Sequence, residues 1–238
     1  MILIYLCAGR GSRLPKIFRT RPKCLVKIRN KTIFERNKNF FEFFKKKIII
    51  TGYKGNYLQA LSRKFNFEII HNQNYRQTNM VYSMFLANKK INDNVVICYG
   101  DIIFDYKIIK LLRSKKNILP VYSKWHTYWK KRMNSNKILT DAENLILKKD
   151  RVITIGGRIL KKIPKYQFTG IIKLEKKKLK ELNKFFKSFK KNIDMTSFLD
   201  ICIKKRKLEL YTKKYHNFWH EIDTKKDIIV ADNSKEFY

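Results

Sequence analysis

Short apolar runs alternate with amphipathic stretches over about the first 125 residues of the chain. This alternation is typical of a parallel β-sheet whose strands are joined by crossover helices. Residues 32–46 carry Phe40, Phe41 and Phe44 at helical spacing, which predicts a helix that packs on the sheet through these rings. Shorter helices are expected from Thr78 or Asn79 onward and over residues 106–113. The predicted strands are residues 2–7, 47–51, 67–71, 95–99 and 117–122.

After residue 123 the pattern becomes less regular. Residues 124–143 mix polar and aromatic side chains, and no regular element is predicted for them. A hairpin is expected over 144–148 and 151–155, strands over 167–174 and 208–212, and helices over about 175–190, 195–205 and 224–232. Because no linker or repeat separates the two parts, we expect one α/β domain over residues 1–238. It would have a mixed, mostly parallel central sheet with helices on both faces.

Glycines follow three of the predicted strands, where an open parallel sheet binds its ligands. They are Gly9 and Gly11, Gly52, and Gly100. Glycine adopts positive φ without strain, so the N–H groups of residues 9–13 can converge on phosphate oxygens. Arg13 and Lys23 would add fixed positive charge. These features predict a cradle for a triphosphate at the carboxyl edge of the sheet.

Two common phosphate-binding motifs do not fit this loop. A dinucleotide fingerprint requires a third small residue at the position of Leu14, and a P-loop ends in Gly-Lys-Ser/Thr, which is missing here. An ordinary strand-to-helix turn remains the alternative at this point.

Two aspartates lie at positions suited to a metal ion. Asp101 follows Gly100 at the end of a predicted strand, and Asp223 precedes a predicted helix, in a chain with only 19 acidic residues. Mg²⁺ takes one or two protein carboxylates and completes its shell with water and substrate oxygens. Each aspartate could instead be a helix cap or a turn residue.

Composition limits the other possibilities. The chain has 55 basic and 19 acidic residues, a net charge of +36, which suggests either attraction of nucleotides or a basic nucleic-acid-binding protein. The basic residues are spread along the chain, so no specific nucleic-acid partner is expected. No apolar run is long enough for a membrane span, and the four cysteines stand singly, so we expect a cytoplasmic protein with reduced core cysteines.

The segment from Leu6 to Arg13, with Pro22 and Lys23, resembles the signature of the nucleotidyltransferase superfamily, in which sugar-1-phosphate nucleotidylyltransferases and small-molecule cytidylyltransferases share the pattern Leu-x-Ala-Gly-x-Gly-x-Arg. Cys7 replaces the usual alanine. The resemblance implies a Rossmann-like (GT-A-like) domain with a nucleotide-binding half, residues 1–123, and an acceptor-binding half, residues 124–238. It also implies Mg²⁺ held by Asp101 and Asp223, and catalysis by these two residues with Lys23 and Arg13.

Later segments are similar to cytidylyltransferases that act on phosphocholine, 2-aminoethylphosphonate or phosphoglutamine. These segments include Gly52-Tyr53, Thr78-Asn79-Met80, Gly100-Asp101, Asp141-Ala142-Glu143 and Glu221-Ile222-Asp223. The nucleotide-binding residues implied are Leu6, Ala8, Gly9, Arg10, Gly11, Ser12, Arg13, Lys23, Gly52, Asn79, Ser83 and Gly100. The acceptor-binding residues implied are Tyr128, Trp129, Arg132, Asp141, Glu143 and Glu221, although Tyr128 and Trp129 could equally be packing residues. Residues 134–140 and the pair Phe168-Thr169 depart from the family pattern, which leaves the acceptor open.

The expected activity is therefore transfer of CMP from CTP to a small phosphorylated or phosphonate acceptor, with Mg²⁺ as cofactor and pyrophosphate as leaving group. The anionic acceptor oxygen needs no general base, because the second pKa of a phosphate is about 6. A sugar-1-phosphate nucleotidylyltransferase using UTP or dTTP is the nearest alternative, and a homodimer is possible.

Overall fold

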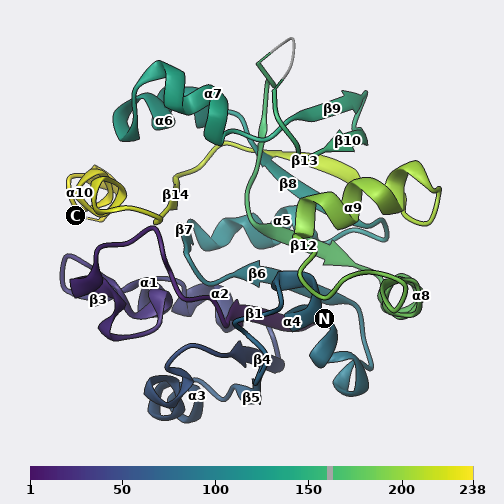
Figure 1. Ribbon diagram of the computed structural model, residues 1–238, viewed down its shortest axis with the longest axis horizontal. Coiled ribbons are helices and arrows are strands. Elements are labelled where there is room, and N and C mark those ends of the chain that lie inside the picture. The colour runs from purple at the N-terminus through teal and green to yellow at the C-terminus, as the bar shows by residue number, and fades with distance from the viewer. Residues whose placement is uncertain (160–162, 238) are drawn as a thin grey trace.

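The computed structural model describes residues 1–159 and 163–237, and a ten-stranded sheet crosses this part of the chain (Figure 1). The strand order is β5-β4-β1-β6-β12-β8-β13-β10-β9, with β11 paired to β8. The strands are β1 (Ile2–Cys7), β4 (Lys46–Thr51), β5 (Glu68–His71), β6 (Val95–Tyr99), β8 (Ile118–Tyr122), β9 (Leu145–Lys148), β10 (Arg151–Ile155), β11 (Gln167–Phe168), β12 (Ile171–Leu174) and β13 (Tyr211–Tyr215).

Most strands of this sheet run in one direction. Strands β5, β4, β1 and β6 pair in parallel, as do β8 and β13. Strand β12 lies between β6 and β8 and runs antiparallel to both, and β10 and β11 are also reversed. The predicted mixed, mostly parallel α/β sheet is confirmed.

The helices cover both faces of the sheet because the strands alternate their side chains. The helices are α1 (Ile33–Arg36), α2 (Lys38–Phe41), α3 (Gln59–Lys64), α4 (Met80–Leu86), α5 (Ile109–Leu112), α6 (Trp125–Arg132), α7 (Ser135–Asp141), α8 (Lys176–Phe186), α9 (Met195–Lys204) and α10 (Lys225–Asp232). In β1, Ile2, Ile4 and Leu6 belong to the core beneath α4, α8 and α9, whereas Leu3 and Tyr5 belong to the core beneath α1, α2, α5 and α6.

The single helix expected over residues 32–46 is wrong, because the chain forms two short helices there. The break falls at Asn37, whose φ of −90° and ψ of 4° leave the helical region. Its buried side-chain amide donates to the carbonyl oxygen of Ile102 at 2.8 Å, a tertiary bond that local spacing does not reveal. Phe40, Phe41 and Phe44 are nevertheless buried, as predicted.

Three other expected elements differ from the structure. The strand over 167–174 is divided at Gly170, whose φ is +79°, so that β11 pairs with β8 and β12 with β6. The strand expected at 208–212 begins three residues later as β13, and residues 124–143 contain helices α6 and α7. Helix α6 buries aromatic residues and Arg132, and α7 buries Ile138, through tertiary contacts that the local pattern does not reveal.

The four cysteines, Cys7, Cys24, Cys98 and Cys202, are all free and buried, as expected. Among the described residues, no helix is both long and apolar enough to span a membrane.

Candidate active site

A short antiparallel strand pair brings the two predicted metal aspartates together. Strand β7 (Ile102–Phe104) begins directly after Asp101, and β14 (Trp219–Glu221) ends just before Asp223. In this pair Ile102 lies opposite Glu221, and the N–H of Ile222 donates to the carbonyl oxygen of Asp101 at 2.9 Å. The ladder therefore aligns two carboxylates that are far apart in the sequence.

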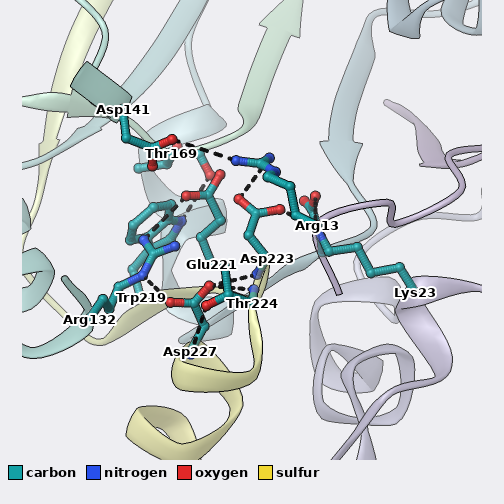
Figure 2. Close-up of polar contacts among 11 residues, drawn as sticks. Arg13, Lys23, Arg132, Asp141, Thr169, Trp219, Glu221, Asp223, Thr224 and Asp227 are labelled. Atoms are coloured by element: carbon teal, nitrogen blue, oxygen red, sulfur yellow. Dashed lines mark hydrogen bonds and ion pairs between the residues drawn. The ribbon is translucent and has the colours of Figure 1, made fainter. Parts of the chain in front are cut away.

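Lys23 lies between these carboxylates, and Arg13 contacts one of them (Figure 2). The Lys23 Nζ donates to Asp101 Oδ2 at 2.8 Å and also to Asp223 Oδ1. The Arg13 Nη2 lies 2.8 Å from Asp223 Oδ2. Lys23 and Asp223 are nearly buried, whereas 59% of the Arg13 side chain is exposed. The structure thus brings together all four residues predicted to be catalytic.

The carboxylates keep both cations charged. Burial alone would lower the pKa of the Lys23 ammonium, but the charges of Asp101 and Asp223 outweigh burial and raise this pKa. Burial likewise opposes the charge on Arg13, and the carboxylates of Asp223, Glu221 and Asp141 raise its pKa. Two fixed positive charges therefore face the centre of the site at neutral pH.

The aspartate pair also fits a divalent cation. Both carboxylates already contact one cation, the Lys23 ammonium, and Asp101 Oδ1 is buried without a hydrogen-bond partner among the described residues. In that part of the chain no group of three or more His, Cys, Asp or Glu side chains could hold a metal by itself. Two aspartates with substrate oxygens match the coordination habit of Mg²⁺, which rarely relies on protein ligands alone.

A cavity of about 470 Å³ opens beside this centre at the carboxyl ends of β1 and β6. It is the candidate nucleotide cavity. The lining includes these predicted nucleotide-binding residues: Leu6, Ala8, Gly9, Gly11, Ser12, Arg13, Lys23, Asn79 and Gly100. Arg10, Gly52 and Ser83 are not part of this described lining, and Ser83 is buried and accepts a hydrogen bond from Asn72. Their predicted roles are left without direct geometric support.

Gly52 and Gly100 allow the strand-end loops to approach each other closely. A Cβ atom at Gly52 would lie 2.6 Å from the carbonyl oxygen of Ala8, and one at Gly100 would lie 2.7 Å from that of Leu6. Gly11 has a φ of +60°, as the cradle interpretation requires. At Gly9, by contrast, a Cβ atom would meet no other atom within 4 Å, so this side of the loop faces open space.

A second cavity of about 200 Å³ adjoins the first and shares Arg13, Met80, Tyr99 and Asp101 with it. It is the candidate acceptor cavity. Of the predicted acceptor-binding residues, its lining includes Trp129, Asp141, Glu143 and Glu221. Burial, followed by the charge of Asp223, raises the pKa of Glu221 to about 8, and burial raises the pKa of Glu143. These carboxyl groups lie in surroundings that favour a positively charged ligand group.

Tyr128 and Arg132 lie behind this cavity rather than in its described lining. The Tyr128 ring packs against Trp219 and His220, with centroid distances of 6.0 and 5.0 Å. The guanidinium of Arg132 is buried between Glu221 and Asp227 (Figure 2). The packing interpretation of Tyr128 therefore has geometric support.

Sequence reasoning assigned no site role to three polar residues of this region. Asp194 and Thr196 line the acceptor cavity, where the Thr196 hydroxyl donates to Glu143 Oε1 at 2.8 Å. Asp227 lies beneath Asp223 and accepts its N–H. The pattern Thr224-x-x-Asp227 is that of a capping box, so the sequence contained a signal for the helix start but none for this contact.

A family model described as a MobA-like NTP transferase domain matches residues 3–126, slightly more than half of the chain. The chain belongs to this family. The expected membership in the nucleotidyltransferase superfamily is confirmed, and the protein is a nucleotidyltransferase. The glycine loop, Arg13, Lys23 and Asp101 lie within the matched region, and Asp223 contacts it through Lys23.

Two curated relatives are similar over different lengths. The chain is 30% identical over 257 residues to the CTP:phosphoglutamine cytidylyltransferase of Campylobacter jejuni, covering 97% of this chain and 98% of that protein. It is 32% identical over 139 residues to a choline-phosphate cytidylyltransferase of Haemophilus influenzae, covering 57% of this chain and 59% of that protein.

Solved structures agree with the fold. The CTP:phosphocholine cytidylyltransferase of Streptococcus pneumoniae superposes with a TM-score of 0.74 at 18% identity, covering 97% of each chain. The inositol-1-phosphate CTP transferase of T. maritima gives a TM-score of 0.75 at 19% identity, covering 100% of this chain and 93% of that one. At these identities the likeness concerns the fold alone.

Proposed function

We propose that this nucleotidyltransferase transfers CMP from CTP to a small phosphate or phosphonate acceptor that also carries an ammonium group, and releases pyrophosphate. Two adjoining cavities of opposite character carry the proposal. One presents Arg13 and Lys23 with a glycine loop, and the other presents carboxylates and aromatic rings. The similarity to cytidylyltransferases for phosphoglutamine and choline phosphate supports CTP as the donor.

The acidity of the acceptor cavity is the more informative feature. Five of the 19 acidic residues line it, although the net charge of the chain is +36. They are Asp101, Asp141, Glu143, Asp194 and Glu221. The phosphate end of such an acceptor can face Arg13, which lines the same cavity, and its ammonium end would be held by the carboxyl groups and by the faces of Trp129 and Trp219.

The reaction follows from charge and position. An acceptor phosphate oxygen, largely anionic near neutral pH, attacks the α-phosphorus of CTP without a general base. A new P–O bond forms while the bond from the α-phosphorus to the bridging oxygen breaks, and pyrophosphate leaves with that electron pair. Lys23 and Arg13 stabilise the charge that develops on the phosphoryl oxygens, and the cradle holds the two anions in line.

The residues that would hold Mg²⁺ are Asp101 and Asp223, which face one another across Lys23. When bound there, the metal would neutralise triphosphate charge and polarise the α-phosphoryl group. Lys23 would then contact phosphate oxygens in place of one or both carboxylates, since its ammonium now occupies the space between them.

Pyrophosphate release tests this proposal. The purified protein is assayed with Mg²⁺ and CTP, UTP or dTTP against phosphocholine, 2-aminoethylphosphonate, phosphoglutamine and a sugar 1-phosphate. We expect release with CTP and at least one ammonium-bearing acceptor, and none when EDTA removes the metal. Turnover only with UTP or dTTP and a sugar 1-phosphate would establish the alternative nucleotidylyltransferase, and silence with every pair would refute the proposal.

A further inference from the structure

A buried ion pair lies directly beneath the turn that carries Asp223. Asp227, in the first turn of α10, accepts the N–H of Asp223 at 2.9 Å and that of Thr224 at 2.7 Å through Oδ2. Its other oxygen, Oδ1, accepts a hydrogen bond from Arg132 Nε at 2.6 Å. Only 1% of each of the two side chains is exposed. Figure 2 shows this chain of contacts running from α6 to the centre of the site.

Arg132 is itself held from several sides. Its Nη1 donates to Glu221 Oε2 at 3.3 Å, and its guanidinium lies 5.3 and 5.2 Å from the ring centroids of Tyr128 and Trp129. The fork of the guanidinium therefore connects Glu221, at the end of β14, with Asp227, at the start of α10. These two residues flank Asp223 in the sequence on either side.

The turn between β14 and α10 determines where the Asp223 carboxylate points. Glu221 pairs with Ile102 in the strand ladder, and the next residues leave the ladder before the helix begins. Two N–H groups of this turn, those of Asp223 and Thr224, donate to one carboxylate oxygen of Asp227. A metal ligand held in this way needs its supporting contacts, because misdirected ligands lose affinity.

We propose that Asp227 and Arg132 are positioning residues for the Asp223 carboxylate. Arg132 fixes Asp227, Asp227 fixes the backbone of Asp223, and the carboxylate of Asp223 is thereby aimed at Asp101 and Lys23. The pair thus makes helix α6, in the acceptor-binding half, part of the support of the metal site. This inference rests on the proposed function, in which Asp223 holds Mg²⁺.

Binding of Mn²⁺, a paramagnetic substitute for Mg²⁺, tests the inference without turnover. Electron paramagnetic resonance follows a Mn²⁺ titration of the protein with CTP present and no acceptor. In Asp227→Asn the side chain keeps one acceptor oxygen, which can serve the two N–H groups or Arg132 but not both. Arg132→Lys keeps the positive charge but loses the planar guanidinium that donates to Asp227 and Glu221 at the same time. For both variants we expect Mn²⁺ affinity about tenfold or more below that of the wild type.

A matched control separates positioning from loss of stability. Glu35 closes the capping box of α1 by accepting the N–H of Thr32 at 2.9 Å, and no described contact links it to either metal aspartate. Glu35→Ala removes this acceptor, so it should lower the unfolding temperature, as the other variants do, and leave Mn²⁺ affinity unchanged. With saturating metal, the acceptor KM of Asp227→Asn should also equal that of the wild type.

The outcomes separate the two proposals. Wild-type affinity for Mn²⁺ in both folded variants would overturn the positioning role and leave the proposed function intact. If the wild type itself binds no Mn²⁺ in the presence of CTP, the metal site fails, and the positioning role fails with it. Should Asp227→Asn not fold, Arg132→Lys decides by the same criterion.

Discussion

The nucleotide cavity and the acceptor cavity adjoin, yet they are built in opposite ways. The first takes most of its lining from residues 6–13 and 23–24, which are the end of β1 and parts of the segment that follows it. The second collects side chains from α6, α7, β11, α9 and β14. The first presents Arg13, Lys23 and the glycines of the loop beside the aspartate pair, and the second presents mainly carboxyl groups and aromatic rings. The lining of the first cavity is thus encoded largely by one stretch of sequence, whereas the lining of the second depends on the whole fold.

The two cavities meet at Arg13 and Asp101, which line both. Arg13 also spans the boundary electrostatically, because its guanidinium lies 2.8 Å from Asp223 and 3.8 Å from Asp141. The comparison therefore predicts two kinds of effect. Substitutions at the shared boundary should lower kcat, whereas substitutions elsewhere in one cavity should raise the KM of one substrate only.

The largest effect is expected beside the shared boundary, from Asp223→Asn, because the Asp223 carboxylate contacts Arg13. The variant loses the negative charge that faces Lys23 and Arg13 and that would hold the metal, so kcat should fall by roughly two to three orders of magnitude. Steady-state pyrophosphate release with saturating CTP and acceptor measures the change.

Asp105→Asn is the control for this variant, because Asp105 lies at the opposite end of the β7–β14 ladder. Its carboxylate accepts the N–H of Lys107 and a hydrogen bond from Asn217. We expect its kcat to remain within about twofold of the wild type, as for other surface substitutions. Equal losses in both variants would mean that damage to the ladder, not the Asp223 charge, causes the effect.

The next largest effect is expected in the acceptor wall, from Glu143→Gln. The glutamine oxygen can still accept the Thr196 hydroxyl, so the main change is loss of negative charge. A charged hydrogen bond contributes about 1.5–3 kcal/mol, so the acceptor KM should rise roughly 10- to 100-fold while the CTP KM stays constant. Because burial raises the pKa of Glu143, the assay is run above neutral pH.

An exposed carboxylate provides the comparison for Glu143. Glu209 pairs with Arg151 at the surface, and Glu209→Gln should leave both KM values unchanged. If Glu143→Gln raised the KM of CTP as much as that of the acceptor, the assignment of CTP to one cavity and the acceptor to the other would be wrong.

This contrast also explains what the sequence could predict. The sequence allowed us to predict the loop after β1 and four residues of the centre, because strand ends, glycines and charged residues can be recognised from the local sequence. The four residues are Arg13, Lys23, Asp101 and Asp223. Their proximity depends on the β7–β14 ladder, which joins segments more than 100 residues apart and leaves no periodic signal in either.

The acceptor wall was less predictable, for a physical reason. Trp129, Asp141, Glu143 and Glu221 were identified through family resemblance, and the structure places them in one lining. Arg132 came from the same resemblance, yet it is buried against Asp227, a contact that depends on how α6 packs on α10. A side chain's direction on a helix of mixed polarity is set by tertiary packing and cannot be read from spacing.

Alanine substitutions at two glycines of the nucleotide cavity should have different effects, one on the unfolding free energy and the other on CTP affinity. A methyl group at Gly100 would lie 2.5 Å from Cys7 Sγ and 2.7 Å from the Leu6 carbonyl oxygen, so Gly100→Ala should lose about 1–3 kcal/mol of unfolding free energy. Gly9 faces open space, so Gly9→Ala should keep its stability within about 0.5 kcal/mol and lose CTP affinity several-fold. Urea unfolding and calorimetric titration with CTP measure the two quantities. Unchanged CTP affinity in Gly9→Ala would place the phosphates elsewhere.

The smallest effect is expected from salt, and it should also differ between the two cavities. The charge of +36 attracts the polyanionic nucleotide over long range, and the screening length falls from about 10 Å at 0.1 M salt to about 3 Å at 1 M. Over that range the CTP KM should rise a few-fold, while the KM of a zwitterionic acceptor, held by short contacts, should change less. A basic nucleic-acid-binding protein would instead bind RNA tightly with a steep salt dependence, and would keep that binding in Asp223→Asn. Salt-dependent RNA affinity that survives this substitution would therefore show that the charge is used for something other than the nucleotide.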